Sequence, residues 1–274
     1  RRFGVSSAAS RVSSGTNTLH LELESAIASF AGMPESVIFS SGYLGMRVLV
    51  EGTARPGDRV LLQENAHSSI KEAIVLSGLE TRTFRLDDLD GLRGMLKSQV
   101  TGSGRLLVVG EGVSPLMGTI FPLPEVLEIL HGHDALVLLD DAHAFGALGA
   151  AGRGTAEYYG LSQDDRRFHC CATLSKAFGA FGGCVAGSSG LIETIRERSM
   201  VYVCGTPPPA PVLGAALAAV NLAAGKPRIL ERLRSNVARL KKGLLALGLD
   251  ADSTPAPIIP VCLKDPARLR KISA

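Results

Sequence analysis

The chain has 274 residues, of which 46% are hydrophobic, so it can build the full core of one large domain or of a large and a small one. Its net charge of +3 is too small to indicate a nucleic-acid-binding protein, no apolar run reaches the length of a membrane span, and no signal peptide is recognisable. The five cysteines form neither a CxxC motif nor a metal-ligand spacing, which indicates reduced thiols in a cytoplasmic protein and predicts no metal site.

Residues 1–17 are rich in Ser, Gly and Ala, and we interpret them as a loop segment. From Thr18 onward, apolar residues recur at helical spacing as far as Gly32, which predicts a helix. A short strand is predicted over 37–39, and a helix over 43–50.

Short apolar runs then alternate with helical patterns along the middle of the chain. Strands are predicted over 60–62, 107–109, 136–139, 170–174 and 184–186, and helices over 68–77 and 125–130. Cys170 and Cys171 are adjacent in one strand, so they should face opposite sides of the sheet. Strands that alternate with helices predict an α/β fold with a mostly parallel sheet flanked by helices.

The last part of the chain is predicted to be mainly helical, over 210–224 and 229–247. The apolar run 258–262 is predicted to be the first strand of a small α+β domain that is incomplete within this chain. We therefore divide the chain into an N-terminal loop segment (1–17), a large cofactor-binding domain (18–207) and the start of a small C-terminal domain (208–274). Because the first residue is arginine and not methionine, we expect a processed or truncated chain.

One lysine follows a predicted strand and precedes a glycine-rich turn. Lys176 comes after the apolar stretch Phe168 to Ala172, in the run Thr-Leu-Ser-Lys-Ala-Phe-Gly. A desolvated lysine has a lowered pKa and can bond covalently to a carbonyl cofactor. The alternative is a surface lysine on a loop.

A pair of acids follows another apolar run. Residues 135–139 are all apolar, as in a fully buried parallel strand, and Asp140-Asp141-Ala142-His143 follows them. Ligands bind beyond the carboxyl ends of such strands, so Asp140 can face a cofactor. Pyridoxal phosphate requires a lysine for its aldehyde, a carboxylate for its ring nitrogen and donors for its phosphate, and Lys176 and Asp140 can meet the first two requirements. The alternative for the two acids is helix capping.

Several further motifs stand in a fixed order along the chain. They are Arg11 to Thr16 with His20 and Glu24, Ser41-Gly42-Tyr43, Ala66 to Ser69, Glu111-Gly112-Val113, Asp140 to His143, Thr173 to Gly183, and Gly205-Thr206. In this order and spacing the chain resembles the α-oxoamine synthases, which are fold-type-I pyridoxal-phosphate transferases, from about Ser10 to Cys262.

The resemblance implies a role for each matching residue. Lys176 would hold the cofactor and move the α-proton of the amino-acid substrate, and Asp140 would pair with the pyridine nitrogen. His143 would bond to the phenolic oxygen, and His67 would stack on the ring. Phosphate ligands are implied at Ser41, Gly42, Tyr43 and Thr173, and at Thr206 of a neighbouring subunit, so the family pattern implies a homodimer with shared sites.

The chain departs from the family pattern at three places. The family serine after the Glu-Gly-Val segment aligns with Pro115 and the following aspartate with Met117, while Ser114, one position earlier, could provide a hydroxyl. Ala144 stands where glycine or serine is usual. The arginine that binds the substrate carboxylate in this family lies beyond the matching residues, so no residue here inherits that role.

The implied activity is an enzymatic condensation of an amino acid with an acyl-CoA or acyl-carrier-protein thioester, with loss of CO₂, to an α-amino ketone. We expect L-alanine as the amino acid, and glycine- or serine-using relatives are the alternative. Three other hypotheses remain: a different fold-type-I reaction, a non-catalytic subunit of the same fold, and a nucleotide-binding oxidoreductase. The last is disfavoured because Gly146, Gly149 and Gly152 do not form GxGxxG.

Overall fold

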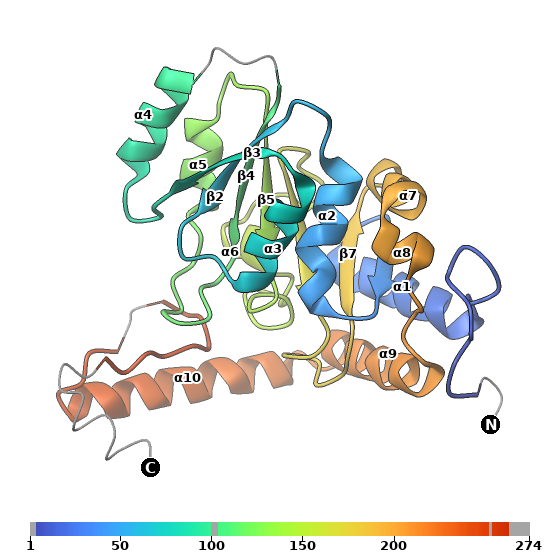
Figure 1. The fold of residues 1–274 in the computed structure, drawn as a ribbon. Coiled ribbons are helices and arrows are strands. Elements are labelled where there is room, and N and C mark those ends of the chain that lie inside the picture. The colour runs from blue at the N-terminus through green and yellow to red at the C-terminus, as the bar shows by residue number, and fades with distance from the viewer. Residues whose placement is uncertain (1–3, 100–103, 252–253, 263–274) are drawn as a thin grey trace, which may run out of the picture.

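A computed structural model describes residues 4–99, 104–251 and 254–262 of the chain. One seven-stranded sheet lies at its centre, with the strand order β1-β7-β6-β5-β4-β2-β3. All neighbouring strands are parallel except β7, which is antiparallel to both β1 and β6. The predicted α/β class with a mostly parallel sheet is therefore confirmed (Figure 1).

The strands are β1 Glu35–Phe39, β2 Arg59–Gln63, β3 Glu80–Phe84, β4 Leu106–Glu111, β5 Ala135–Asp140, β6 Phe168–Thr173 and β7 Gly183–Gly187. The helices are α1 Thr18–Ala31, the 3-10 turn η1 Gly42–Leu44, α2 Gly45–Thr53, α3 Ser68–Ser77, α4 Leu89–Gln99, α5 Leu123–Ile129, α6 Thr155–Tyr158, α7 Ser189–Arg198, α8 Met200–Cys204, α9 Ala210–Gly225 and α10 Arg228–Ala246.

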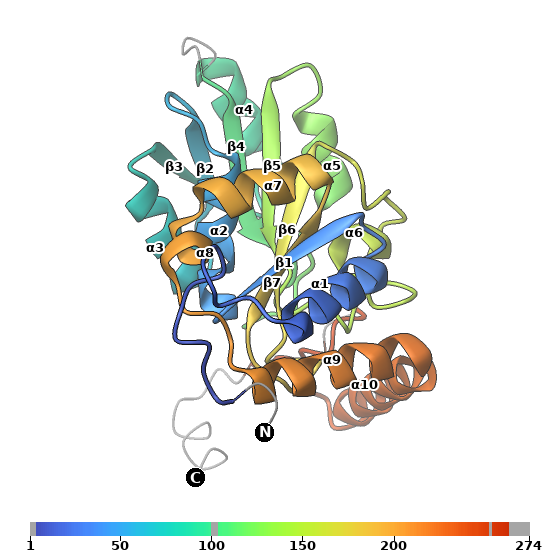
Figure 2. The same cartoon turned by 90° about the vertical axis from the view of Figure 1, so that its right-hand side faces the viewer.

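Helices cover both faces of the sheet, and each face has its own apolar core. On one face, α2, α3, α7 and α8 pack on side chains of the central strands. On the other face, α4 and α5 cover β2, β4 and β5, while α1 and α9 cover β1, β6 and β7 (Figures 1 and 2). Strand alternation divides the two cores, because Val109 and Leu138 face α2 while Val108 and Leu139 face α5.

The adjacent cysteines of β6 follow the same alternation. Cys171 is buried in the core beneath α2, and Cys170 packs against the core on the other face. The prediction that they face opposite sides of the sheet is therefore confirmed.

A buried ion pair holds the segment before α1 against the sheet. Arg11 Nη1 and Nη2 donate to Glu24 Oε1 and Oε2 at 2.8 and 3.0 Å, and the Arg11 guanidinium lies 5.3 Å from the centre of the Tyr202 ring. Glu24 Oε1 also accepts the backbone N–H of Ile38 at 3.1 Å, so one carboxylate joins this segment, α1 and β1. The chain that follows β1 is the one that carries Ser41 and Gly42.

Two strand predictions differ from the structure. Residues 258–262 form no strand, and the prediction there was wrong, because Pro257 and Pro260 lack the N–H that a strand ladder requires. Strand β3 was missed, because it is an edge strand whose first four residues are exposed and whose sequence, Glu-Thr-Arg-Thr-Phe, is mostly polar. Among the described residues, no helix is long and apolar enough to cross a membrane.

Candidate active site

A cavity of about 190 Å³ opens at the carboxyl edge of the sheet. Five strand ends contribute to it, because the chain beyond β1, β2, β4, β5 and β6 turns over the same edge. Its lining residues are Ser41, Gly42, Tyr43, His67, Ser69, Glu111, Asp140, Ala142, His143, Thr173, Ser175 and Lys176. Eight of the nine residues expected at the site from the sequence are thus brought together, and only Thr206 lies elsewhere.

Asp140 ends β5 on the face of the sheet that α2 covers. Its Oδ1 accepts the backbone N–H of Ala142 at 2.9 Å, which fixes the carboxyl at the start of the following turn. Burial raises the pKa of Asp140, while the N–H of Ala142 and the charges of Lys176 and His67 oppose that rise. A carboxyl in this setting gains most from a cation that pairs with it.

Asp141, its neighbour, has a structural role on the other side of β5. Its Oδ1 accepts from Thr155 Oγ1 at 2.6 Å and its Oδ2 from Thr155 N at 2.9 Å. Burial raises its pKa to about 6. The two acids are therefore divided between the site and the fold, and neither caps a helix through the adjacent turn.

Two histidines face the cavity from different elements. His67 is the N-cap of α3, where its Nδ1 accepts Ser69 N–H at 3.2 Å and lies 2.8 Å from Ser69 Oγ. His143 stands in the turn after β5, and burial, followed by the charges of Lys176 and His67, lowers its pKa to about 4. His143 is therefore neutral at pH 7 and has one ring N–H to donate.

A narrow cradle forms where η1 passes β6. A Cβ at Gly42 would lie 2.4 Å from Thr173 Oγ1, so only glycine allows this approach of the backbone. Thr173 is buried, and its Oγ1 lies 2.8 Å from Ser175 Oγ. Ser41 Oγ, on the opposite side, accepts Tyr43 N–H at 3.2 Å. Hydroxyl groups and backbone N–H groups at the start of a helix suit an anion such as a phosphate.

Two of the predicted site residues, Lys176 and Thr206, are more exposed than the sequence suggested or lie away from the cavity. The Lys176 side chain is exposed, because the chain leaves β6 in a turn at the mouth of the cavity, and so it is not the desolvated lysine that the strand pattern suggested. Thr206 is also exposed, in the link between α8 and α9, and does not line the cavity. The role that the resemblance implies for Thr206 belongs to the cavity of a second subunit.

Four lining residues had no assigned role in the sequence, namely Ser69, Glu111, Ala142 and Ser175. Glu111 has the same signal as Asp140, an acid that ends a buried apolar strand, and this signal could have identified it. Ser114 does not line the cavity. Its hydroxyl accepts Met117 N–H at 3.2 Å within its own turn, so it does not replace the family serine at Pro115.

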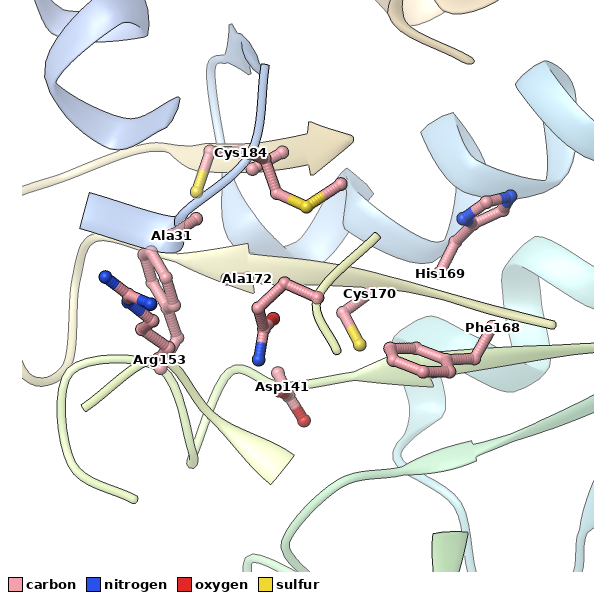
Figure 3. Close-up of a pocket in the computed structure, with 12 residues that line it drawn as sticks. Ala31, Asp141, Arg153, Phe168, His169, Cys170, Ala172 and Cys184 are labelled. Carbon is pink, nitrogen blue, oxygen red and sulfur yellow. The ribbon is translucent and has the colours of Figure 1, made fainter. Parts of the chain in front are cut away.

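A smaller cavity lies on the α1 side of β6 and β7, between Cys170, Cys184 and Phe168 (Figure 3). Its volume is about 40 Å³, which is room for water but not for a cofactor. The cofactor candidate is the larger of these two, because the expected site residues line it.

The larger cavity suits pyridoxal phosphate. Asp140 is a half-buried acid for the ring nitrogen, Lys176 an amine for the aldehyde, and His143 a neutral donor for the phenolic oxygen. The Gly42 and Thr173 cradle offers the small space and the hydroxyls that a phosphate requires. Each of the four polar parts of the cofactor has a chemically matched partner.

Comparisons with known proteins identify the family of the chain. The family model for aminotransferase class I and II matches residues 5–273. The chain is 36% identical to the 8-amino-7-oxononanoate synthase of Ectopseudomonas mendocina, over 100% of this chain and 69% of that protein, and 36% identical to that of Methylococcus capsulatus, over 96% and 67%. A solved serine palmitoyltransferase from S. paucimobilis with bound PLP has a TM-score of 0.87 and 31% identity, covering 97% of this chain and 69% of that one.

Proposed function

Because the chain belongs to the α-oxoamine synthases within the class I and II aminotransferase family, we propose that it is a pyridoxal-phosphate-dependent acyltransferase that condenses L-alanine with an acyl thioester, releasing CO₂ and the thiol. The product would be an α-amino ketone of the 8-amino-7-oxononanoate type, an intermediate of biotin biosynthesis. The observation that carries this proposal is the convergence of Lys176, Asp140, His67 and His143 on one cavity.

Pyridoxal phosphate, when bound, supplies a carbonyl for the amino acid and a ring that withdraws electrons from its Cα. The residues of this chain would keep that ring charged and in place. The Asp140 carboxylate would hold the proton on the ring nitrogen, and the His143 N–H would donate to the phenolic oxygen. His67, fixed by its cap on α3, would cover the ring face. Ser41 and Thr173 would hold the phosphate.

Lys176 would hold the cofactor before the amino acid arrives, and its amine would then move the proton at the substrate Cα. Lys176 lies on a turn at the cavity mouth and not inside a strand. Its side chain can therefore reach into the cavity while it holds the cofactor and withdraw afterwards. Asp140, His143 and Lys176 would each act on charge that develops during the reaction. Charged and polar groups that the fold already holds in place lower the reaction barrier most.

The first experiment is an absorbance titration of the protein with pyridoxal phosphate, repeated with Lys176→Ala. We expect a visible or near-ultraviolet band that the variant lacks. Alanine, glycine and serine, each with pimeloyl-, acetyl- and palmitoyl-CoA, would then be compared by mass spectrometry of the product. Cofactor binding without any product would favour a different fold-type-I reaction, and the absence of binding would favour a non-catalytic subunit.

We further propose that the protein is a cytoplasmic homodimer in which Thr206 of one subunit serves the phosphate of the other. The exposure of Thr206, away from its own cavity, supports this arrangement, and the free cysteines fit a reducing compartment. Mixing inactive Lys176→Ala with a phosphate-binding-deficient Thr206→Glu protein should restore up to about a quarter of the sites if each site takes Lys176 and Thr206 from different subunits. No recovery after verified subunit exchange would contradict sharing.

A further inference from the structure

Glu111 is a buried acid of the cavity for which the proposed chemistry has no use. Its side chain ends β4 and is only 4% exposed. In the register of the sheet, Glu111 is paired directly with Asp140 of β5. Paired residues of neighbouring strands point to the same face, so two acids lie side by side at the cavity floor.

The two oxygens of Glu111 differ in their contacts. Oε1 accepts the backbone N–H of His67 at 3.2 Å. Oε2 is buried and has no hydrogen-bond partner among the described residues. The backbone N–H of Glu111 donates to Gln63 Oε1 at 3.0 Å, which anchors the strand end. A buried carboxyl oxygen without a partner is costly when charged, and the cost falls if that oxygen carries a proton.

The charges that face Glu111 come from three elements. Asp140 faces it from β5, Lys71 and the backbone of His67 from α3, and Lys176 from the turn beyond β6. Burial first, and Asp140 second, raise the pKa of Glu111 to about 7, against the opposing effect of the His67 N–H and the two lysines. Two carboxyls that are paired across neighbouring strands and line the same cavity cannot both ionise readily unless a cation joins them.

Building on the proposed function, we infer that Glu111 is a positioning residue that holds a proton in the cofactor-free protein and releases it to solvent when a cationic ring nitrogen pairs with Asp140. The carboxyl O–H bond breaks, the proton passes to the buffer, and the second negative charge stays beside Asp140. That charge would keep the ring nitrogen protonated, and the ionised Oε1 would hold the His67 N–H more strongly. The release of one proton would thus couple binding of the cofactor ring to the strength of the hydrogen bond that holds the His67 backbone.

The test uses pyridoxamine 5′-phosphate, which has the ring and phosphate but no aldehyde to react with Lys176. Its affinity would be measured by calorimetry from pH 6 to pH 8, in buffers of different ionisation enthalpy, so that released protons are counted. Glu111→Gln keeps an oxygen for the His67 N–H but cannot ionise. Glu64→Gln, an exposed acid just beyond the end of β2, is the matched control.

We expect the affinity of the wild type, divided by that of Glu111→Gln, to increase about three- to tenfold from pH 6 to pH 8, with extra proton release at pH 6 to 7 that the variant lacks. Glu64→Gln should behave as the wild type. Equal proton release in the wild type and Glu111→Gln would overturn the inference.

Infrared spectra of the cofactor-free proteins give a second measurement that does not depend on ligand binding. We expect the C=O band of a protonated carboxyl in the wild type at pH 6, and its weakening in Glu111→Gln. An unchanged band in a folded variant would assign the proton to another acid and overturn the inference. Failure of the wild type to bind any pyridoxal compound would instead refute the proposed function, and the band would still test whether Glu111 holds a proton.

Discussion

At the scale of single residues, the site is a set of charges that the fold holds in costly positions. Asp140 is half-buried at the end of β5 and Asp141 is buried just beyond it, and only the second has its oxygens satisfied by Thr155. The fold thus stabilises one acid fully and leaves the other to a ligand.

Replacing Asp140 by Asn should remove the negative charge that holds the ring nitrogen protonated. We expect the rate of product formation to fall about a hundredfold or more, while the cofactor remains bound through Lys176 and the phosphate. Steady-state rates and the absorbance band would be measured together. Asp134→Asn, at an exposed position just before the same strand, is the control, and a similar loss there would point to damage to β5 instead.

The sequence alone could predict the residues whose place follows from strand ends. Lys176, Asp140 and His143 each follow an apolar run, and the family pattern added His67. The sequence could not predict which acid keeps an unpaired oxygen. The pairing of Glu111 with Asp140 depends on the register between two strands, and these two residues are 29 positions apart in the sequence. Nor could the sequence show that Ser114 is bound within its own turn.

At the scale of elements, the phosphate cradle depends on how closely η1 approaches β6. Gly42 lies against Thr173, and Gly183 of β7 lies against Gly42 in turn, since a Cβ on Gly183 would be 2.9 Å from the Gly42 Cα. Short apolar runs predicted the central strands well. They failed for polar edge strand β3 and for the proline-flanked run 258–262, where hydrogen-bonding capacity and not hydrophobicity decides the structure.

Gly42→Ala should therefore damage cofactor binding. The new methyl group would lie 2.4 and 2.5 Å from Thr173 Oγ1 and Cβ, and Thr173 is buried and cannot move aside. We expect at least about a tenfold loss of pyridoxal phosphate affinity, by titration, with a lowered melting temperature. Gly190→Ala in α7, where a Cβ meets open space, should instead stabilise the protein by about 0.5–1 kcal/mol. Unchanged affinity in Gly42→Ala would contradict the cradle.

At the scale of the whole molecule, two sets of titratable groups have opposite effects on the stability of the folded state as the pH changes. Burial lowers the pKa of His20, His143 and His169 to about 4, and these groups favour the folded state above pH 6.5 and lose that contribution as the pH falls toward 4. Glu111 and Asp141, with pKa values raised to about 7 and 6, act in the opposite direction and contribute most stability at low pH.

His169 lies outside the proposed active site, so it can be tested without altering catalysis. We expect the stability difference between the wild type and His169→Gln to be largest above pH 6.5 and to shrink as the pH falls to 4, because the half-buried neutral imidazole must then take up a proton. Denaturant unfolding across pH 4.5–8 measures it, with His131→Gln in the exposed turn before β5 as control. A difference that does not change with pH would refute the assignment.

The single reversed strand, β7, also fixes when the site can be assembled during synthesis. Strand β1, near the start of the chain, has β7 as its one partner in the sheet, and β7 leaves the ribosome about 150 residues later. Until β7 is available, β1 is unpaired and is not joined to the rest of the sheet, so the loop with Gly42 is not held against β6. Pairing of strands that are far apart in the sequence is slow and leaves unpaired strand edges exposed to chaperones. The cofactor should therefore be captured only after most of the chain has emerged, and nascent chains stalled before Gly183 should be unable to retain it.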